Sequence, residues 1–122
     1  MSDVRADNQI LNETKAFAVR IIRLYTFLRD VRKESVLSKQ MLRSGTSIGA
    51  NVRESVNAQS KMDFINKLNI ALKEANETEY WLELLHETDF LNDEEFLSIY
   101  DDCGKIVATL TKIIKTSKER LS

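Results

Sequence analysis

Residues 61–87 read KMDFINKLNIALKEANETEYWLELLHE, and this stretch carries the clearest periodic pattern in the 122-residue chain. Its apolar and small side chains recur in alternating steps of four and three residues: Phe64, Leu68, Ala71, Ala75, Thr78, Leu82 and Leu85. This spacing keeps side chains on one face of a helix and is typical of the seam of a helix bundle. Ser60, followed three residues later by Asp63, is suited to cap the start. We predict a helix over residues 61–89.

Three further stretches show helical periodicity, and we predict helices over residues 8–31, 36–57 and 93–120. The last of these opens on Asn92 and Glu95, which have the spacing of a capping box. The chain has no proline and only three glycines, so it is poor in the residues that sheets need for their turns. The connections are short, which favours antiparallel neighbours. The prediction is an all-α protein, a single antiparallel up-down four-helix bundle over residues 1–122.

The fourth predicted helix has two apolar seams. One consists of Phe96, Ile99, Cys103, Ile106, Leu110 and Ile113, and the other of Tyr100, Val107, Ile114 and Leu121. One seam is enough to face the core of a narrow bundle, so the second is our candidate for an interface between subunits. The alternative is a helix that is buried more deeply inside one subunit.

The second predicted helix contains a run of small residues that includes Gly45 and Gly49. Glycine inside a helix costs roughly 1 kcal/mol relative to alanine, and close approach of a neighbouring helix is the usual reason to accept that cost. Polar residues follow a spacing of three, four and three on this helix: Ser44, Ser47, Asn51 and Glu54. We predict that Ser47, Asn51 and Glu54 form a buried hydrogen-bonded network with the third helix. The alternative is that they contact a ligand.

The sequence contains no motif typical of a catalytic, cofactor or metal site. His86, the only histidine, has no second ligand at metal-binding spacing, and we interpret it as a solvated side chain. Glu83 and His86 form a single Glu-x-x-His pair, whereas di-metal bundles use two. Cys103 lies on an apolar seam and is predicted to be a buried structural thiol. The polar N-terminus and the lack of a long apolar run predict a soluble, cytoplasmic protein that does not enter the membrane.

Residues 40–54, QMLRSGTSIGANVRE, resemble the signature of the 23S rRNA intervening-sequence proteins, a bacterial family also called S23 ribosomal proteins. Further positions that fit the family are Asp63-Phe64, Ile70-Ala71, Glu77-Thr78-Glu79, Leu82 and Leu91. The resemblance extends from about Ile10 to Leu121. It implies an antiparallel four-helix bundle, commonly assembled as a homopentamer, for which no catalytic activity is established. A related branch, the accessory protein of diversity-generating retroelements, binds nucleic acid.

The resemblance therefore implies a non-enzymatic, homo-oligomeric accessory protein that associates with RNA or DNA. The alternative is an oligomeric scaffold that binds another protein and no nucleic acid. The retroelement branch is strongly basic, whereas this chain has a net charge of -1, so any nucleic-acid contact has to rely on a local patch. Our candidates for that patch are Arg20, Arg23, Arg29, Arg32, Lys33, Lys39 and Arg43.

The charge of the chain is unevenly distributed along the sequence. Residues 15–53 hold nine Lys or Arg and two acids, while residues 54–103 hold three Lys and thirteen acids. Such asymmetry can mark a nucleic-acid surface or a partner surface. It also arises when helices of opposite charge lie side by side, and the net charge near zero favours this second interpretation.

Overall fold

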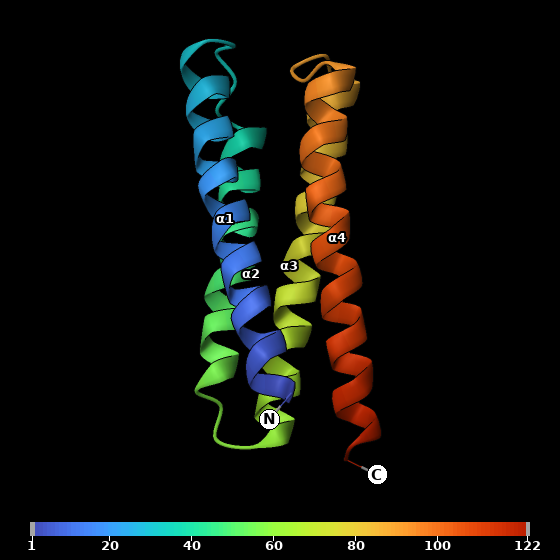
Figure 1. Ribbon diagram of the computed structural model, residues 1–122. Coiled ribbons are helices and arrows are strands. Elements are labelled where there is room, and N and C mark those ends of the chain that lie inside the picture. The colour runs from blue at the N-terminus through green and yellow to red at the C-terminus, as the bar shows by residue number, and fades with distance from the viewer. Residues whose placement is uncertain (1, 122) are drawn as a thin grey trace.

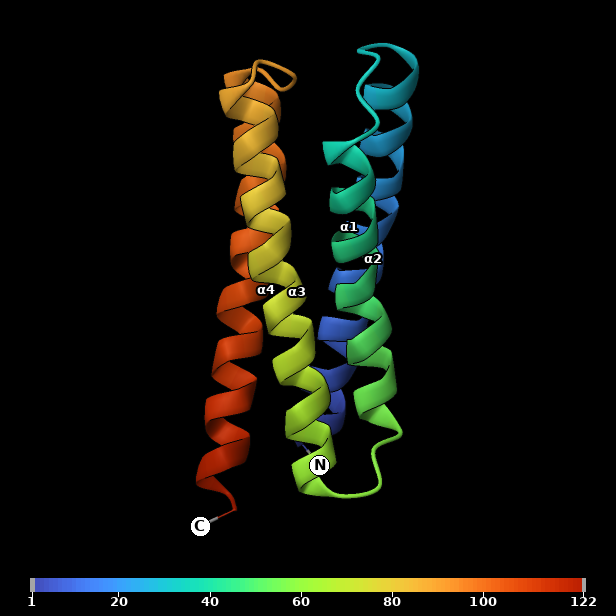
Figure 2. The same cartoon turned by 180° about the vertical axis from the view of Figure 1, so that it is seen from behind.

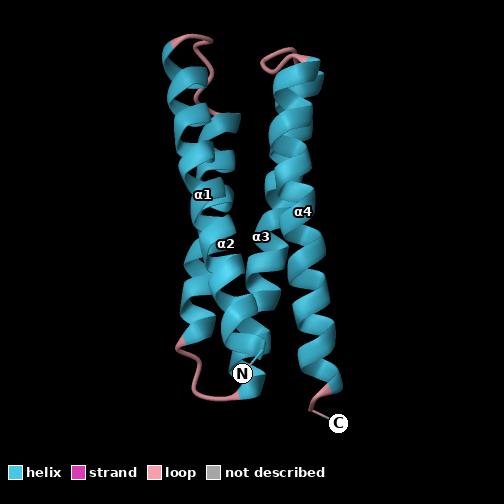
Figure 3. Ribbon diagram, viewed as in Figure 1, coloured by secondary structure: helices cyan, strands magenta, loops and turns pink. Residues whose placement is uncertain are grey.

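The computed structural model describes the backbone of residues 2–121 and the side chains of residues 8–121. The described chain contains four helices and no strand: α1 Ser2–Asp30, α2 Leu37–Val56, α3 Lys61–Glu87 and α4 Asp93–Glu119. Each helix runs antiparallel to the one before it (Figures 1 and 3). The predicted all-α fold with four helices is confirmed. The main difference is at α1, which begins at Ser2 rather than near residue 8.

The helices pack most closely with their neighbours along the chain. α2 lies against both α1 and α3, and α3 also contacts α4, whereas α1 and α4 touch only sparingly. Seen from either side, α1 and α2 form one pair and α3 and α4 the other (Figures 1 and 2). The contact between α2 and α3 therefore holds the two helix pairs together, whereas the first and last helices, α1 and α4, are packed less closely.

The core is built from the seams that the periodicity identifies. Six of the seven residues in the α3 seam are buried, and Phe64 is the one that stays partly exposed. The fully buried large side chains come from every helix: Ile10, Ile21, Leu28, Met41, Ile48, Val52, Leu68, Leu82, Leu85 and Leu110. Burying a side chain of this kind contributes about 1.5–3 kcal/mol. No helix within residues 2–121 has the length and apolar character needed to cross a membrane.

The small residues of α2 allow α1 to approach closely. A Cβ atom built on Gly45 lies 2.9 Å from two side-chain carbons of Ile21. One built on Gly49 lies 3.3 Å from the backbone oxygen of Thr14. The prediction that helix proximity explains these glycines is confirmed.

Side chains cap three of the helices at their N-terminal ends. Asn92 and Glu95 form the predicted capping box of α4, and Ser60 accepts a hydrogen bond from the amide of Asp63 at 3.1 Å. At α2 the carboxylate of Glu34 accepts hydrogen bonds from the backbone amides of residues 36–38, at 3.0, 2.9 and 2.7 Å. Glu34 is thus buried with its charge compensated by the unpaired amides of a helix end.

The two seams of α4 are not separate faces, which corrects one prediction. Ile114, assigned to the outward seam, is buried in the core with a relative exposure of 6%. Tyr100 and Val107 are half-buried and pack against the core cluster, and Tyr100 is also hydrogen-bonded to Glu83 of α3. Only Leu121 is exposed. The second seam is therefore mostly used within the chain, and Tyr100 contacts α3 through its hydrogen bond to Glu83.

Candidate nucleic-acid interface

Three of the seven candidate bases bridge helices of the same chain. Arg20 of α1 reaches α4, where it pairs with Asp102 at 2.5 Å and donates to the Ser98 hydroxyl at 2.5 Å. Arg32, just after α1, forms a bidentate ion pair with Glu95 at 2.7 and 2.9 Å. The same guanidinium donates to the Phe90 carbonyl at 2.6 Å. These contacts tie the basic first hairpin to the acidic second one.

Arg43 forms the corresponding bridge between α2 and α3. Its guanidinium lies 2.6 Å from the Glu77 carboxylate and 3.8 Å from that of Glu74. Glu54 of α2 also faces Lys67 of α3, at 3.7 Å. The interpretation that helices of opposite charge lie side by side is therefore confirmed for these pairs. Exposed ion pairs of this kind each contribute about 0–1 kcal/mol.

The other four candidates are exposed. Arg29 is paired with its neighbour Asp30 at 2.7 Å, and this ion pair holds the pKa of Asp30 below its usual value. Arg23, Lys33 and Lys39 form no ion pair with any side chain between residues 8 and 121. The candidate set thus divides into bridging bases, whose charge is compensated within the chain, and exposed bases.

Two bases that the candidate set omits, Lys15 and Arg53, lie on a surface that both helices share. They line a groove of about 500 Å³ between α1 and α2, whose lining also includes Thr46 and Gly49. Both side chains are exposed. The run of small residues in α2 was the signal that α1 packs there. Pairing the two helices at Gly49 brings Lys15 and Arg53 to one groove.

Heptad spacing extends this surface along the hairpin. Residues seven apart share a helical face, so Arg29 lies two heptads beyond Lys15 on α1, and Lys39 lies two heptads before Arg53 on α2. Lys15 and Arg53 line one groove. Because the helices are antiparallel, Arg29, near the end of α1, and Lys39, near the start of α2, both lie toward the other end of the hairpin. We call Lys15, Arg29, Lys39 and Arg53 the basic face. At 1.5 Å per residue it is about 21 Å long.

The predicted polar network of α2 is wrong in its position. Ser47 and Asn51 are half-buried and bond within their own helix, to the carbonyls of Arg43 and Ser47 at 2.7 and 2.8 Å. The side chain of Glu54 is 61% exposed, and its link to α3 is the ion pair with Lys67. The three-four spacing identified a common face correctly, but that face lies at the edge of the helix interface rather than inside it.

The buried polar contact between α2 and α3 lies one turn earlier. The hydroxyl oxygens of Ser44 and Thr78 are 2.8 Å apart, and both side chains are fully buried. Thr78 belongs to the α3 seam, and Ser44 belongs to the polar set of α2. Because neither hydroxyl reaches water, each one needs a hydrogen-bond partner inside the protein, and the two lie close enough to bond to each other.

The remaining titratable candidates have structural environments. His86 is stacked on Phe96, with ring centroids 4.2 Å apart, and its Nε2 lies 2.7 Å from Asp93, so it is more ordered than a solvated side chain. A hydrogen bond to Glu83 and burial raise the pKa of Tyr100 to about 12. Cys103 is buried as predicted, and burial raises the pKa of its thiol to about 12. Within the described residues no cluster of His, Cys, Asp and Glu is arranged to hold a metal ion.

The fold and the charged surfaces define an antiparallel four-helix bundle whose first hairpin is basic and whose second is acidic. Residues 6–112 match the 23S rRNA-intervening sequence proteins, and the chain belongs to that family. It is similar to a protein of unknown function from the S23 ribosomal protein family of Bacteroides thetaiotaomicron VPI-5482, whose crystal structure is known. The two are 59% identical, with a TM-score of 0.89, over 90% of this chain and 98% of that one. A comparison with curated proteins found no match.

Proposed function

We propose that this protein is a non-enzymatic, homo-oligomeric accessory protein that binds RNA through the basic face of the α1–α2 hairpin. The observation that carries the proposal is the groove between α1 and α2, which Lys15 and Arg53 line together with one acid, Glu54. Arg29 and Lys39 add two further exposed bases toward the other end of the same hairpin. Of these four bases, Lys15, Lys39 and Arg53 form no ion pair with any described side chain. Bases of this kind are free to neutralise phosphates.

The rest of the charge distribution supports this orientation. The acids are concentrated on α3 and α4, and several of them compensate Arg20, Arg32 and Arg43. A polyanion is therefore attracted to the first hairpin and repelled by the second, although the net charge is only -1. Assembly of several copies multiplies a weak patch into a stronger binding surface.

The test is the salt dependence of binding to a fluorescent RNA hairpin, measured by anisotropy. Each phosphate contact contributes roughly 0.7–0.9 to the slope of log affinity against log salt. Reversing Lys39 and Arg53 together, as Lys39→Glu and Arg53→Glu, is expected to weaken binding at least tenfold at low salt and to reduce that slope by about 1–2.

Lys73→Glu is the matched control, because Lys73 is exposed on α3, in the acidic hairpin. We expect it to leave both affinity and slope nearly unchanged. Arg20 and Arg43 are unsuitable for this test, since a glutamate there would face Asp102 or Glu77 and weaken the bundle itself. Equal loss of binding in the Lys73→Glu variant, or no binding at low salt, would contradict the proposal.

Self-association into a homopentamer is the second part of the proposal. Family membership supports it, together with large apolar side chains exposed on three helices: Ile22 of α1, Ile70 and Tyr80 of α3, and Leu97 of α4. A second copy that covers such residues removes them from water. Native mass spectrometry at micromolar concentration measures the stoichiometry directly. A monomer would overturn this part while leaving the RNA proposal open to its own test.

An oligomeric scaffold that binds another protein is the competing function. The exposure of Val19 and Ile22 on α1, at 42% and 47%, is the observation that favours it. An apolar contact of this kind resists salt, whereas phosphate binding does not. Retention of a protein partner at high salt, combined with no affinity for RNA at low salt, would select the scaffold.

A further inference from the structure

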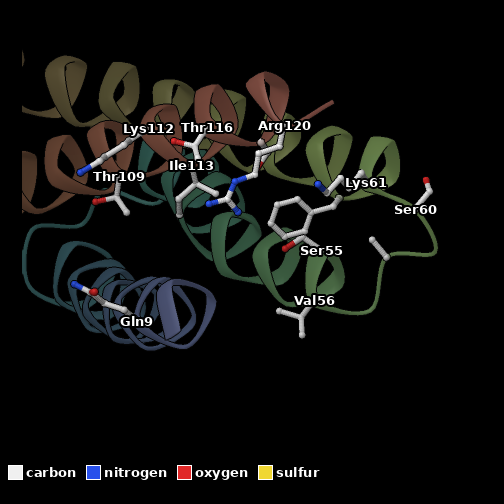
Figure 4. A pocket seen from close by; sticks show the side chains of 13 residues that line it. Gln9, Ser55, Val56, Ser60, Lys61, Thr109, Lys112, Ile113, Thr116 and Arg120 are labelled. Atoms are coloured by element: carbon white, nitrogen blue, oxygen red, sulfur yellow. The ribbon is translucent and has the colours of Figure 1, made fainter. Parts of the chain in front are cut away.

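A pocket of about 630 Å³ lies at the end of the bundle where α2 ends and α3 begins. All four helices contribute to its lining, with Gln9 from α1, Ser55 from α2, Phe64 from α3 and Ile113 from α4. Figure 4 shows Ile113 and Arg120 projecting from α4 into the space that Gln9 and Ser55 border from the other side. The volume falls within the range of about 300–1,000 Å³ that small-molecule sites occupy.

The pocket offers an apolar surface to a ligand. Phe64 is the one seam residue of α3 that the fold leaves half-exposed, and Ile113 is half-exposed on the first seam of α4. Both pack against the core at their inner sides. The opening between α1 and α4, which touch only sparingly, leaves these two side chains accessible.

The charged lining of this pocket has a single sign. Lys61, Lys112 and Arg120 are among its thirteen lining residues, and none of those thirteen is Asp or Glu. Lys112 and Arg120 belong to residues 105–122, which hold five bases and one acid, whereas Lys61 lies at the start of the acidic stretch 54–103. Cations gathered around a partly apolar hollow favour an anion and disfavour a cation of the same shape. The pocket shares no lining residue with the groove of the basic face.

We propose that this pocket binds a small amphiphilic anion, an organic carboxylate with an aliphatic body. The body lies against Phe64 and Ile113, where it removes apolar surface from water. The carboxylate lies toward the cationic part of the lining, which consists of Lys61, Lys112 and Arg120 and supplies charge-assisted hydrogen bonds. This site is independent of the proposed RNA association.

Octanoate is the probe, titrated by isothermal calorimetry and by amide NMR, with octylammonium as the ligand of equal length and opposite charge. We expect saturable octanoate binding, with shifts concentrated around Ser55, Phe64 and Ile113. The double variant Lys61→Gln and Lys112→Gln is expected to weaken binding about tenfold. Lys115→Gln is the matched control, because Lys115 is exposed on α4 but does not line the pocket, and it is expected to bind like the wild type.

Thr116→Trp provides a second test that does not alter charge. Thr116 lines the pocket and is exposed, so an indole there fills the hollow without disturbing the core. We expect this variant to lose octanoate binding while its thermal unfolding midpoint stays close to that of the wild type. Equal affinity for octylammonium, equal weakening by Lys115→Gln, or no saturable binding of octanoate would each overturn the proposal.

Discussion

A Cβ atom on Gly45 would lie 2.9 Å from Cγ1 and Cγ2 of Ile21, so the α1–α2 contact has no room for a methyl group at this position. Ile21 is fully buried and its branched side chain is stiff at χ1, so it cannot easily move aside. We predict that Gly45→Ala lowers the free energy of unfolding by about 1–2 kcal/mol, because overpacking outweighs the gain in helix propensity.

Gly104→Ala is the control for that prediction. Apart from its chain neighbours and the backbone of its own helix, no atom lies within 4 Å of a Cβ built on Gly104, which is also inside a helix. The only remaining effect of the substitution is the higher helix propensity of alanine, so the free energy of unfolding should rise by up to about 1 kcal/mol. Urea unfolding followed by circular dichroism measures both. A similar increase in the free energy of unfolding in both variants would contradict close packing at Gly45.

The buried hydroxyl pair Ser44–Thr78 should couple α2 to α3. Thr78→Val keeps the shape of the side chain but removes the hydroxyl, and we expect it to cost about 1–2 kcal/mol. In a double-mutant cycle with Ser44→Ala, the coupling should be about 0.5–1.5 kcal/mol. Asn51→Ala is the comparison, since Asn51 bonds within its own helix and is only half-buried. If Asn51→Ala lowered the free energy of unfolding more than Thr78→Val does, the buried network predicted around Asn51 would be supported after all.

Glu34 should make stability depend on acid pH. Burial raises the pKa of this carboxyl, but the hydrogen bonds from the amides of Leu37, Ser38 and Val36 outweigh burial and hold the pKa below its usual 4.5. A depressed pKa in the folded state stabilises the protein above the unfolded pKa. That stabilisation is lost as pH falls through the folded value.

Glu34→Gln tests this dependence, because the amide keeps the size of the side chain but not its charge. We expect a loss of about 1–2 kcal/mol near pH 7 that shrinks as the pH approaches about 3. Asp101→Asn, at an exposed position on α4, is the matched removal of one carboxylate. If the difference in free energy of unfolding between the wild type and Glu34→Gln stayed constant over this pH range, the helix-capping role of Glu34 would be contradicted.

Cys103 should be unreactive in the folded protein. It is fully buried, its Sγ donates to the carbonyl of Ala75 at 3.4 Å, and burial raises its pKa to about 12. The thiolate is the reactive species, so an aromatic disulfide reagent near neutral pH should label it only when the bundle opens. Labelling should become rapid in concentrated urea. Rapid labelling without denaturant would show that α3 and α4 separate readily.

The sequence by itself determined the secondary structure and the buried seams. The period from Phe64 to Leu85 identifies the face of α3 that becomes part of the core, because helix geometry alone decides which side chains share a face. The capping box at Asn92 and Glu95 is equally local, since its hydrogen bonds join residues three apart. Gly45 and Gly49 further indicated that another helix comes close.

Only the tertiary structure decided which helix lies beside which face. Arg20, Arg32 and Arg43 are paired with acids between 34 and 82 positions away along the chain, and no local pattern reveals such partners. The same reason explains why Ile114 is buried, why Ser44 rather than Asn51 is the buried partner of α3, and why Lys15 lies beside Arg53. Helical spacing fixes the direction of a side chain relative to its own axis, whereas its neighbour depends on how separate helices rotate and pack against one another.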